Sequence, residues 1–383
     1  MRITGWRLDE RRETVEVSAE IGGYRIFYRV PKPFQVSLAG DPFLASALLP
    51  AMLKGETIEV DPGLAVSPRL LRNLAVVQEI HHRWNPDLKI VRIEARTAAG
   101  PALNTGAFSF FSGGVDSLYT FLKRRREITH AVYVHGFDFL RTRDEFLAAA
   151  ERNGSFAAGF GKTLIPVETN HHAYDYHLGL SRLLTQGSTL ASVALVLGFP
   201  RAYIPSSFSY SELVPLGSHP LLDPRYSTEA VEIVHDGAEA GRVEKLTAVA
   251  ACEPALANLV VCIDEMNGNC GRCEKCLRTM VALASLGVRA PLFPELPPLK
   301  SIRRRYREEY PRLLSENLEL ALHAGRSDLA RVLRSIERRT EWIRLSKDAD
   351  RVLFGGALLR AFRRVRKPPK RAVNWIGVVP PQN

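Results

Sequence analysis

The segment FSFFSGGVDSLYTFL, residues 108–122, constrains the fold of the chain more than any other. Its apolar run stops at Ser-Gly-Gly, and apolar residues then return at helical spacing. This order predicts a buried strand, a tight turn and an amphipathic helix. Two glycines let the backbone bring its N–H groups close to an oxyanion, and the start of the next helix favours negative charge. We therefore expect a phosphate-binding turn in which Ser112 and Ser117 add hydroxyl donors and Asp116 orients Mg²⁺ or a nucleotide.

From Gly106 onward, predicted strands alternate with predicted helices, which is typical of a parallel sheet. The clearest helix covers residues 178–197. Ligands of open parallel sheets bind at the carboxyl ends of the strands, so residues directly after each strand are the main candidates for binding. We expect strands at 107–111, 131–134, 163–168, 201–205, 231–235 and 259–262.

The first 103 residues predict a small mixed α+β domain without a catalytic constellation. Two alternating segments, 14–21 and 24–30, flank Gly22-Gly23 and predict a hairpin. Asp41-Pro42 and Ser67-Pro68 each have the pattern of a helix start. Further strands are expected at 57–60 and 88–93, and the polar segment 97–105 marks the boundary. The predicted domains are residues 1–103, 104–297 and 298–383.

The last predicted domain is helical and carries the excess positive charge of the chain. From Lys300 to the end there are 21 Lys and Arg against 9 Asp and Glu. Such a segment suits nucleic acid, an acidic partner or a solvated helical face. The solvated face is favoured over nucleic acid, because the arginines at 303–305 lie near glutamates and lack interleaved aromatic residues for base stacking. Helices are expected at 313–324, 329–336 and 353–362.

Length and composition predict a cytoplasmic protein with no membrane partner. With 383 residues and 46% hydrophobic content, the chain can bury a substantial core in two or three domains. No apolar run approaches the roughly 20 residues of a membrane helix. The first residues also lack the apolar region of a signal peptide.

All five cysteines lie between residues 252 and 276, which favours a metal site over scattered disulfides. Four of them, Cys262, Cys270, Cys273 and Cys276, include two Cys-x-x-Cys steps that share Cys273. Four thiolates complete the tetrahedral coordination of zinc and leave no open position, so we expect a structural Zn²⁺ site. An iron–sulfur cluster is the alternative, since thiolates also bind iron.

The hexapeptide Ser-Gly-Gly-Val-Asp-Ser resembles the PP-loop of the N-type ATP pyrophosphatases, whereas no Walker-type G-x-x-x-x-G-K-[ST] occurs. Together with the cysteine loop, residues 106–286 are similar to the 7-cyano-7-deazaguanine synthases and their longer bacterial relatives in antiviral defence clusters. The resemblance implies an adenine-nucleotide-hydrolase-like α/β fold, a parallel sheet with helices on both faces and a zinc loop. It implies an ATP loop made of Ser112, Gly113, Gly114, Val115, Asp116 and Ser117, of which Asp116 and Ser117 are catalytic.

The same resemblance implies a ligase or synthase that adenylates a carboxylate with Mg-ATP and releases pyrophosphate. The favoured carboxylate is 7-carboxy-7-deazaguanine, and the acceptor is ammonia, with possible nitrile formation, or a protein amine. The alternatives are an adenylating tRNA thiolase and a catalytically silent nucleotide-binding subunit. The chain departs from the synthases in its additional terminal domains and in residues 206–223, so the substrate, the acceptor and the oligomeric state stay open.

Several further residues are candidates because of their position after predicted strands. His135 and Asp138 follow the second strand, where ATP would lie, and a plain loop is the alternative. Gly187 interrupts a helical pattern, either to admit a nucleotide or for packing. His171, His172 and His177 are expected in a solvated loop rather than at a metal. The loop after the fourth strand offers Tyr210, Glu212, His219, Asp223 and Arg225 as substrate readers.

Overall fold

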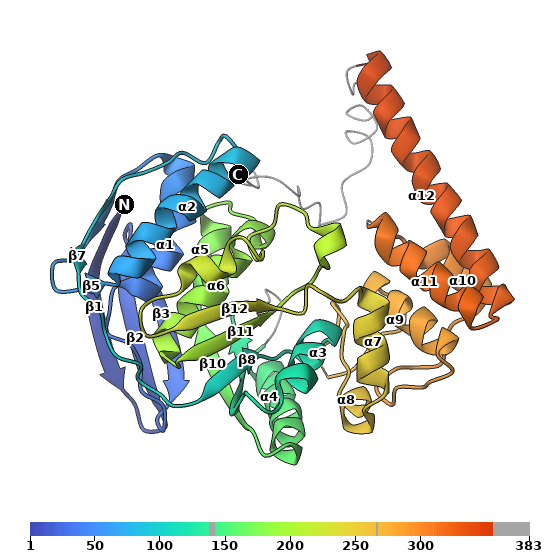
Figure 1. Cartoon of the computed structure of the whole chain (residues 1–383), viewed down its shortest axis with the longest axis horizontal. Coiled ribbons are helices and arrows are strands. Elements are labelled where there is room, and N and C mark those ends of the chain that lie inside the picture. The colour runs from blue at the N-terminus through green and yellow to red at the C-terminus, as the bar shows by residue number, and fades with distance from the viewer. Residues whose placement is uncertain (138–141, 266, 309, 355–383) are drawn as a thin grey trace. The chain divides into compact units, whose positions relative to one another are not determined.

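A computed structural model describes residues 1–137, 142–265, 267–308 and 310–354 (Figure 1). The chain forms two compact units, one ending at Glu239 and one beginning at Ala240, and each is described by itself. These units do not follow the predicted boundaries after residues 103 and 297. The reasons are a shared sheet in the first unit and a shared core in the second.

The first unit is built on one large, mostly parallel sheet, with ten strands among the described residues. Its strand order is β12-β11-β8-β9-β10-β3-β2-β1-β4-β6, and β5 and β7 form a separate pair. The strands from β12 to β10 run parallel, β10, β3, β2 and β1 pair antiparallel, and β4 and β6 run parallel to β1. The bounds are β1 Arg2–Glu10, β2 Thr14–Ile21, β3 Tyr24–Pro31, β4 Ile58–Val60, β5 Ala65–Val66, β6 Ile93–Glu94, β7 Arg96–Thr97, β8 Ala107–Phe110, β9 His130–His135, β10 Thr163–Thr169, β11 Arg201–Pro205 and β12 Glu232–Asp236.

Helices cover both faces of the parallel strands. Figure 1 shows α3 and α4 on one side of the sheet and α1, α2, α5 and α6 on the other. Phe111, directly after β8, packs against Phe121 of α3 and Phe156 of α4. The opposite face buries apolar residues of α1 and α6 in one core with the strands. The bounds are α1 Asp41–Lys54, α2 Pro68–Trp84, α3 Val115–Arg124, α4 Arg143–Gly159, α5 His171–His177 and α6 Arg182–Leu197.

The N-terminal hairpin is part of this sheet rather than of a separate domain. β3 pairs with β10 through Tyr28 opposite Thr169 and Arg29 opposite Glu168. The hydroxyl of Tyr28 is buried between Ser46 of α1 and Ser192 of α6, at 2.8 and 2.9 Å. Because these bonds join elements on both sides of residue 103, the polar segment 97–105 does not separate two cores.

Most elements expected from periodicity are present, and the exceptions have identifiable causes. The hairpin around Gly22-Gly23 is confirmed, and so is the α2 start, where Ser67 Oγ accepts from the Leu70 N–H. Residues 259–262 were expected as a strand, which is wrong: the Asn269 side chain accepts from Val261 N and donates to Leu259 O, in place of a neighbouring strand. Of residues 88–93, only Ile93 lies in a strand, and β1 was not expected.

The second unit is helical and includes the cysteine loop. A helical domain was expected only from residue 298 onward. Its helices are α7 Arg242–Ala250, α8 Glu253–Ala257, α9 Glu274–Ser285, α10 Leu299–Arg305, α11 Pro311–His323 and α12 Ser327–Phe354. Leu277 and Val281 of α9 share a core with Ile302, Leu314 and Leu333 of the last three helices. This shared core places the cysteine loop in the C-terminal unit. The helix expected at 353–362 falls almost wholly outside the described residues, and within them no helix is long and apolar enough to cross a membrane.

Asp41, the first residue of α1, lies next to the first turn of α2. Its Oδ1 accepts from the Ser67 N–H at 2.7 Å. Burial raises the pKa of Asp41 to about 6, and the charge of Glu229 adds to the effect.

Replacing Asp41 with asparagine is expected to raise the free energy of unfolding by about 1–3 kcal/mol near neutral pH. The raised pKa means that protonated Asp41 stabilises the fold fully at a pH below its ordinary pKa of 3.8. This contribution is lost as the pH rises from 3.8 towards about 6. The gain from Asp41→Asn should therefore shrink as the pH falls through that interval. Urea unfolding at several pH values measures it, with the exposed Asp87→Asn as control. An equal gain at every pH would contradict the assignment.

Candidate functional site

The Ser-Gly-Gly turn lies between β8 and α3, as the sequence predicted. Gly113 has a φ of +78°, a left-handed conformation that favours glycine. Gly114 is the N-cap residue of α3 and brings no side chain to cap the helix. The first turn of α3 therefore presents its backbone N–H groups beside a glycine, which is the geometry that suits an oxyanion.

Hydrogen bonds between the two serines fix the shape of the turn. Ser117 Oγ donates to Gly114 O at 3.0 Å and accepts from Ser112 N at 3.2 Å. The Ser112 and Ser117 hydroxyls lie 3.3 Å apart. Val115 and Ser117 are buried, Asp116 is half-buried in the first turn of α3, and Ser112 is exposed. The turn is thus held from inside, while Ser112 faces outward.

This turn lies at the topological switch point of the sheet. β8 is central, with β9 and β10 following on one side and β11 and β12 on the other. In sheets of this order, the crevice outside the carboxyl ends of the two central strands binds ligands. The loop after β8 holds residues 112–117, and the loop after β11 begins at Ser206. These two loops therefore flank the place where a ligand is expected.

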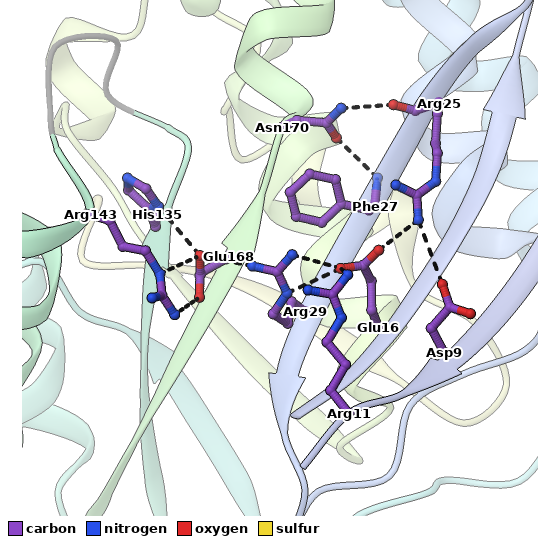
Figure 2. Close-up of polar contacts among 10 residues, drawn as sticks. All are labelled: Asp9, Arg11, Glu16, Arg25, Phe27, Arg29, His135, Arg143, Glu168 and Asn170. Carbon is purple, nitrogen blue, oxygen red and sulfur yellow. Dashed lines mark hydrogen bonds and ion pairs between the residues drawn. The ribbon is translucent and has the colours of Figure 1, made fainter. Parts of the chain in front are cut away.

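His135 ends β9 next to this turn, but its ring is occupied by neighbours. It stacks on Phe146, with ring centroids 4.7 Å apart, and its Nδ1 lies 3.9 Å from Glu168. Glu168 also accepts from Arg29 and Arg143, so His135 belongs to a charge network at the ends of β9 and β10 (Figure 2). Asp138 lies outside the described residues.

The network continues into the N-terminal hairpin through Arg29. Figure 2 shows Arg29 between Glu168 and Glu16, with Arg11 and Arg25 also directed at Glu16. The Glu16 side chain is only 1% exposed. Burial acts to raise its pKa, but hydrogen bonds from Arg29 and Arg25 outweigh it, and the pKa is lowered overall. The arginines thus keep a buried carboxylate ionised.

The space beside Gly187 is occupied by other residues of the chain. A Cβ built at this position would lie 2.0 Å from Gly217 O and 2.7 Å from Asp223 Oδ1. The backbone of the loop after β11 therefore occupies the space beside α6 at Gly187. Of the two readings of this glycine, the geometry fits packing and gives no room for a nucleotide there.

The histidines at 171, 172 and 177 lie on α5, not in a loop. His171 and His172 are buried, at 1% and 5% exposure, so the expected solvated loop is wrong. His171 Nδ1 lies 3.1 Å from Thr189 Oγ1 and 3.4 Å from Asp175 Oδ2. α5 packs against α6 and β3, and this packing buries His171 and His172. The short polar sequence of α5 did not indicate that these side chains would be buried.

The substrate-reader candidates after β11 divide into two groups. Tyr210 and Arg225 are exposed and Glu212 is half-buried. His219 and Asp223 are buried, and Asp223 Oδ2 lies 2.7 Å from His235 Nδ1 of β12. The sequence singled out neither His235 nor Glu168. Each is the next-to-last residue of a parallel strand, so a search of the carboxyl ends of the strands would have found them.

The four cysteines form the only group that could hold a metal ion in the part of the chain that the structure describes. Their Sγ atoms all lie within 4.8 Å of one another. Two of the Sγ–Sγ distances are 3.9 and 4.0 Å. A tetrahedral zinc with Zn–S bonds of about 2.3 Å requires about 3.8 Å between sulfurs. The spacing therefore suits zinc.

Backbone donors around the sulfurs support the same interpretation. Asp264 N and Glu265 N donate to Cys262 Sγ at 3.3 and 3.2 Å, and Cys273 N donates to Cys270 Sγ at 3.3 Å. The hydrogen bond from Cys276 lowers the pKa of Cys273 to about 5, and the same contact raises the pKa of Cys276. A bound Zn²⁺ would favour the ionised, ligating form of all four thiols.

Comparison with known proteins adds no relative: no family model, no curated protein and no solved structure matches the chain.

Replacing Cys273 with serine should remove the metal and lower the melting temperature of the chain. Cys273 is central to both Cys-x-x-Cys steps, and structural zinc contributes directly to folding. We expect about one zinc per chain in the wild type and less than about half of that in the variant. Metal analysis by mass spectrometry measures it.

Cys252→Ser is the matched control, since Cys252 is the cysteine outside the cluster. It should leave both metal content and melting temperature unchanged. Equal metal loss in the two variants would show that the cluster does not hold the ion, and bound iron in place of zinc would favour the cluster alternative.

Proposed function

We propose that the chain is an ATP-dependent ligase or synthase that activates a carboxylate by adenylation. The observation that carries this proposal is the Ser112–Ser117 turn: it combines the PP-loop sequence, a left-handed Gly113 and a position at the topological switch point. A glycine turn alone would indicate only an anion site. The motif favours pyrophosphate as that anion.

In the proposed reaction, a carboxylate oxygen attacks the α-phosphorus of ATP. The bond from this phosphorus to the oxygen bridging to the β-phosphate breaks, and pyrophosphate leaves with the electron pair. The N–H groups of the turn and the hydroxyl of Ser112 would stabilise the charge on the leaving pyrophosphate. Ser117 would hold the turn in shape, because its hydroxyl donates to Gly114 O. Asp116, in the first turn of α3, would orient the Mg²⁺ that accompanies ATP.

In the second step, an amine attacks the activated acyl carbon, a C–N bond forms, and AMP leaves. By resemblance, 7-carboxy-7-deazaguanine is the favoured acid, and ammonia or a protein amine is the acceptor. With ammonia, the further step of the resembling synthases is a second ATP-dependent round, in which the amide oxygen is adenylated and leaves with AMP to give the nitrile. The substrate assignment rests on the two motifs alone.

The cysteine cluster would hold Zn²⁺ in a structural role. Four sulfur ligands leave no position for a substrate oxygen or water. This arrangement also counts against a tRNA thiolase, because sulfur transfer through persulfides requires a free cysteine pair. Only Cys252 remains outside the cluster among the five cysteines of the chain.

Asp116→Asn is expected to lower AMP and pyrophosphate formation by about 100-fold or more, because the amide has no charge to orient Mg²⁺. The assay contains Mg-ATP, 7-carboxy-7-deazaguanine and ammonia, and follows AMP by chromatography and the product by mass. A protein acceptor is tested by a mass increase on proteins from the same gene neighbourhood.

Asp144→Asn is the matched control, because Asp144, like Asp116 in α3, is an acid in the first turn of its helix, α4, but is exposed and outside the Ser-Gly-Gly turn. It should retain wild-type rates. If the wild type releases no AMP with any acid or acceptor, the adenylation proposal fails and the silent nucleotide-binding subunit is favoured.

A further inference from the structure

The loop after β11, residues 206–226, is long but has a defined conformation. Its regular structure consists of two short 3₁₀ helices, η1 Tyr210–Glu212 and η2 Asp223–Tyr226. Long loops of this kind in compact units are commonly functional. This loop also flanks the switch point opposite the Ser-Gly-Gly turn, so what holds it in place bears on the site.

The middle of the loop packs closely on α6 through two glycines, Gly217 of the loop and Gly187 of the helix. Gly217 N donates to Leu183 O at 2.7 Å. A Cβ at Gly217 would lie 1.9 Å from Leu184 O, just as one at Gly187 would lie 2.0 Å from Gly217 O. The two backbones approach so closely that neither position accepts a side chain. The close approach therefore fixes the position of Gly217 on α6.

Asp223 ties the far end of the loop to the sheet. The Asp223 side chain is fully buried and the His235 side chain is 3% exposed. Asp223 Oδ2 is 2.7 Å from both His235 Nδ1 and the Ser218 hydroxyl, which donates to it. The His219 N–H donates to Oδ1. A buried carboxylate with these partners fixes loop and strand together, since removing a partner leaves it unsatisfied.

The N-terminal segment supports the loop from outside. Trp84 of α2 packs edge-on against His219, with ring centroids 5.0 Å apart. At the other end of the helix, Arg69 donates from its backbone N–H to Glu229 and from its side chain to Thr228 O. Both ends of α2 therefore contact the chain between β11 and β12.

The start of the loop lies beside the helix of the Ser-Gly-Gly turn. Ser206 N donates to Asp236 O and Tyr210 N donates to Ala238 O, at 2.8 and 2.7 Å. A Cβ at the intervening Gly237 would lie 3.4 Å from Thr120 Oγ1 of α3. Past this anchor, the side chain of Tyr210 is 62% exposed. The anchored backbone thus leaves an exposed surface next to α3.

We propose that loop 206–226 is the wall that recognises the carboxylate substrate, and that Asp223, His235 and α2 are its positioning elements. The inference rests on the proposed adenylation and adds where the acid is read. The Ser-Gly-Gly turn binds ATP on one side of the switch point, and the loop binds the acid on the other. Loosening the Asp223 contacts therefore weakens acid binding and leaves ATP binding intact.

His235→Gln and His235→Asn form a matched pair for the test. An asparagine amide nitrogen takes nearly the place of His235 Nδ1 and donates to Asp223, whereas a glutamine amide nitrogen takes nearly the place of Nε2. We expect the glutamine variant to raise the KM for 7-carboxy-7-deazaguanine by about tenfold, the factor that corresponds to about 1.4 kcal/mol. Its KM for ATP should stay within about twofold of wild type, and the asparagine variant should retain both values.

AMP release with ammonia as acceptor supplies both constants. Equal KM changes for acid and ATP, or equal loss in both variants, would reduce the pair to a general structural role and overturn the inference. If the glutamine variant does not fold, Ser218→Ala takes its place, because it removes one hydrogen bond to Asp223. The same comparison of the KM for the acid with the KM for ATP then tests the inference. A wild type without AMP release overturns adenylation and this inference together, whereas an active wild type with an unchanged acid KM in the folded variants overturns only the inference.

Discussion

The pairing of β3 with β10 is the contact on which the first unit depends. Without it, β10 would be an edge strand with unpaired backbone groups. Asn170, directly after β10, strengthens the pairing by accepting from Phe27 N at 3.0 Å and donating to Arg25 O at 2.7 Å. Because β3 is fixed in this register, α1 and α2 are brought onto the same face as α6, and the N-terminal segment becomes part of the site.

Charge makes this register selective. Arg29 contacts both Glu16 in its own hairpin and Glu168 on β10. A shift of β3 against β10 by one residue would turn Arg29 to the opposite face of the sheet and take this cation away from Glu168. The network in Figure 2 thus specifies pairing between segments that are about 140 residues apart in sequence. Arg29 and Arg143 also neutralise Glu168, near the end of β10.

Local patterns in the sequence predicted local structure well. The apolar segments that end in glycine or polar turns became β8 to β12, and the Ser67-Pro68 start became a capped helix. The main differences come from contacts that a local sequence pattern does not include. Residues 259–262 have strand-like composition but are bonded by Asn269, and α5 is buried by elements on either side of it in the sequence. Composition also cannot reveal that β3 pairs with β10, across the boundary predicted after residue 103.

The candidate site divides in the same way. The turn and the cysteine spacing could be read from sequence because all their members lie within a few residues or repeat at ligand spacing. Gly187 could not be resolved, since a glycine that admits a ligand and one that admits a backbone look alike until Gly217 is placed beside it. The expectation that ligands bind at the carboxyl ends of the strands identifies candidate side chains. It does not say which of them are already engaged in contacts within the protein. His135, Asp223 and His235 are engaged by protein neighbours, whereas Ser112 and Tyr210 are exposed. A ligand that bridges the switch point would therefore meet exposed groups on an anchored backbone, and the buried strand-end pairs would set where those groups stand.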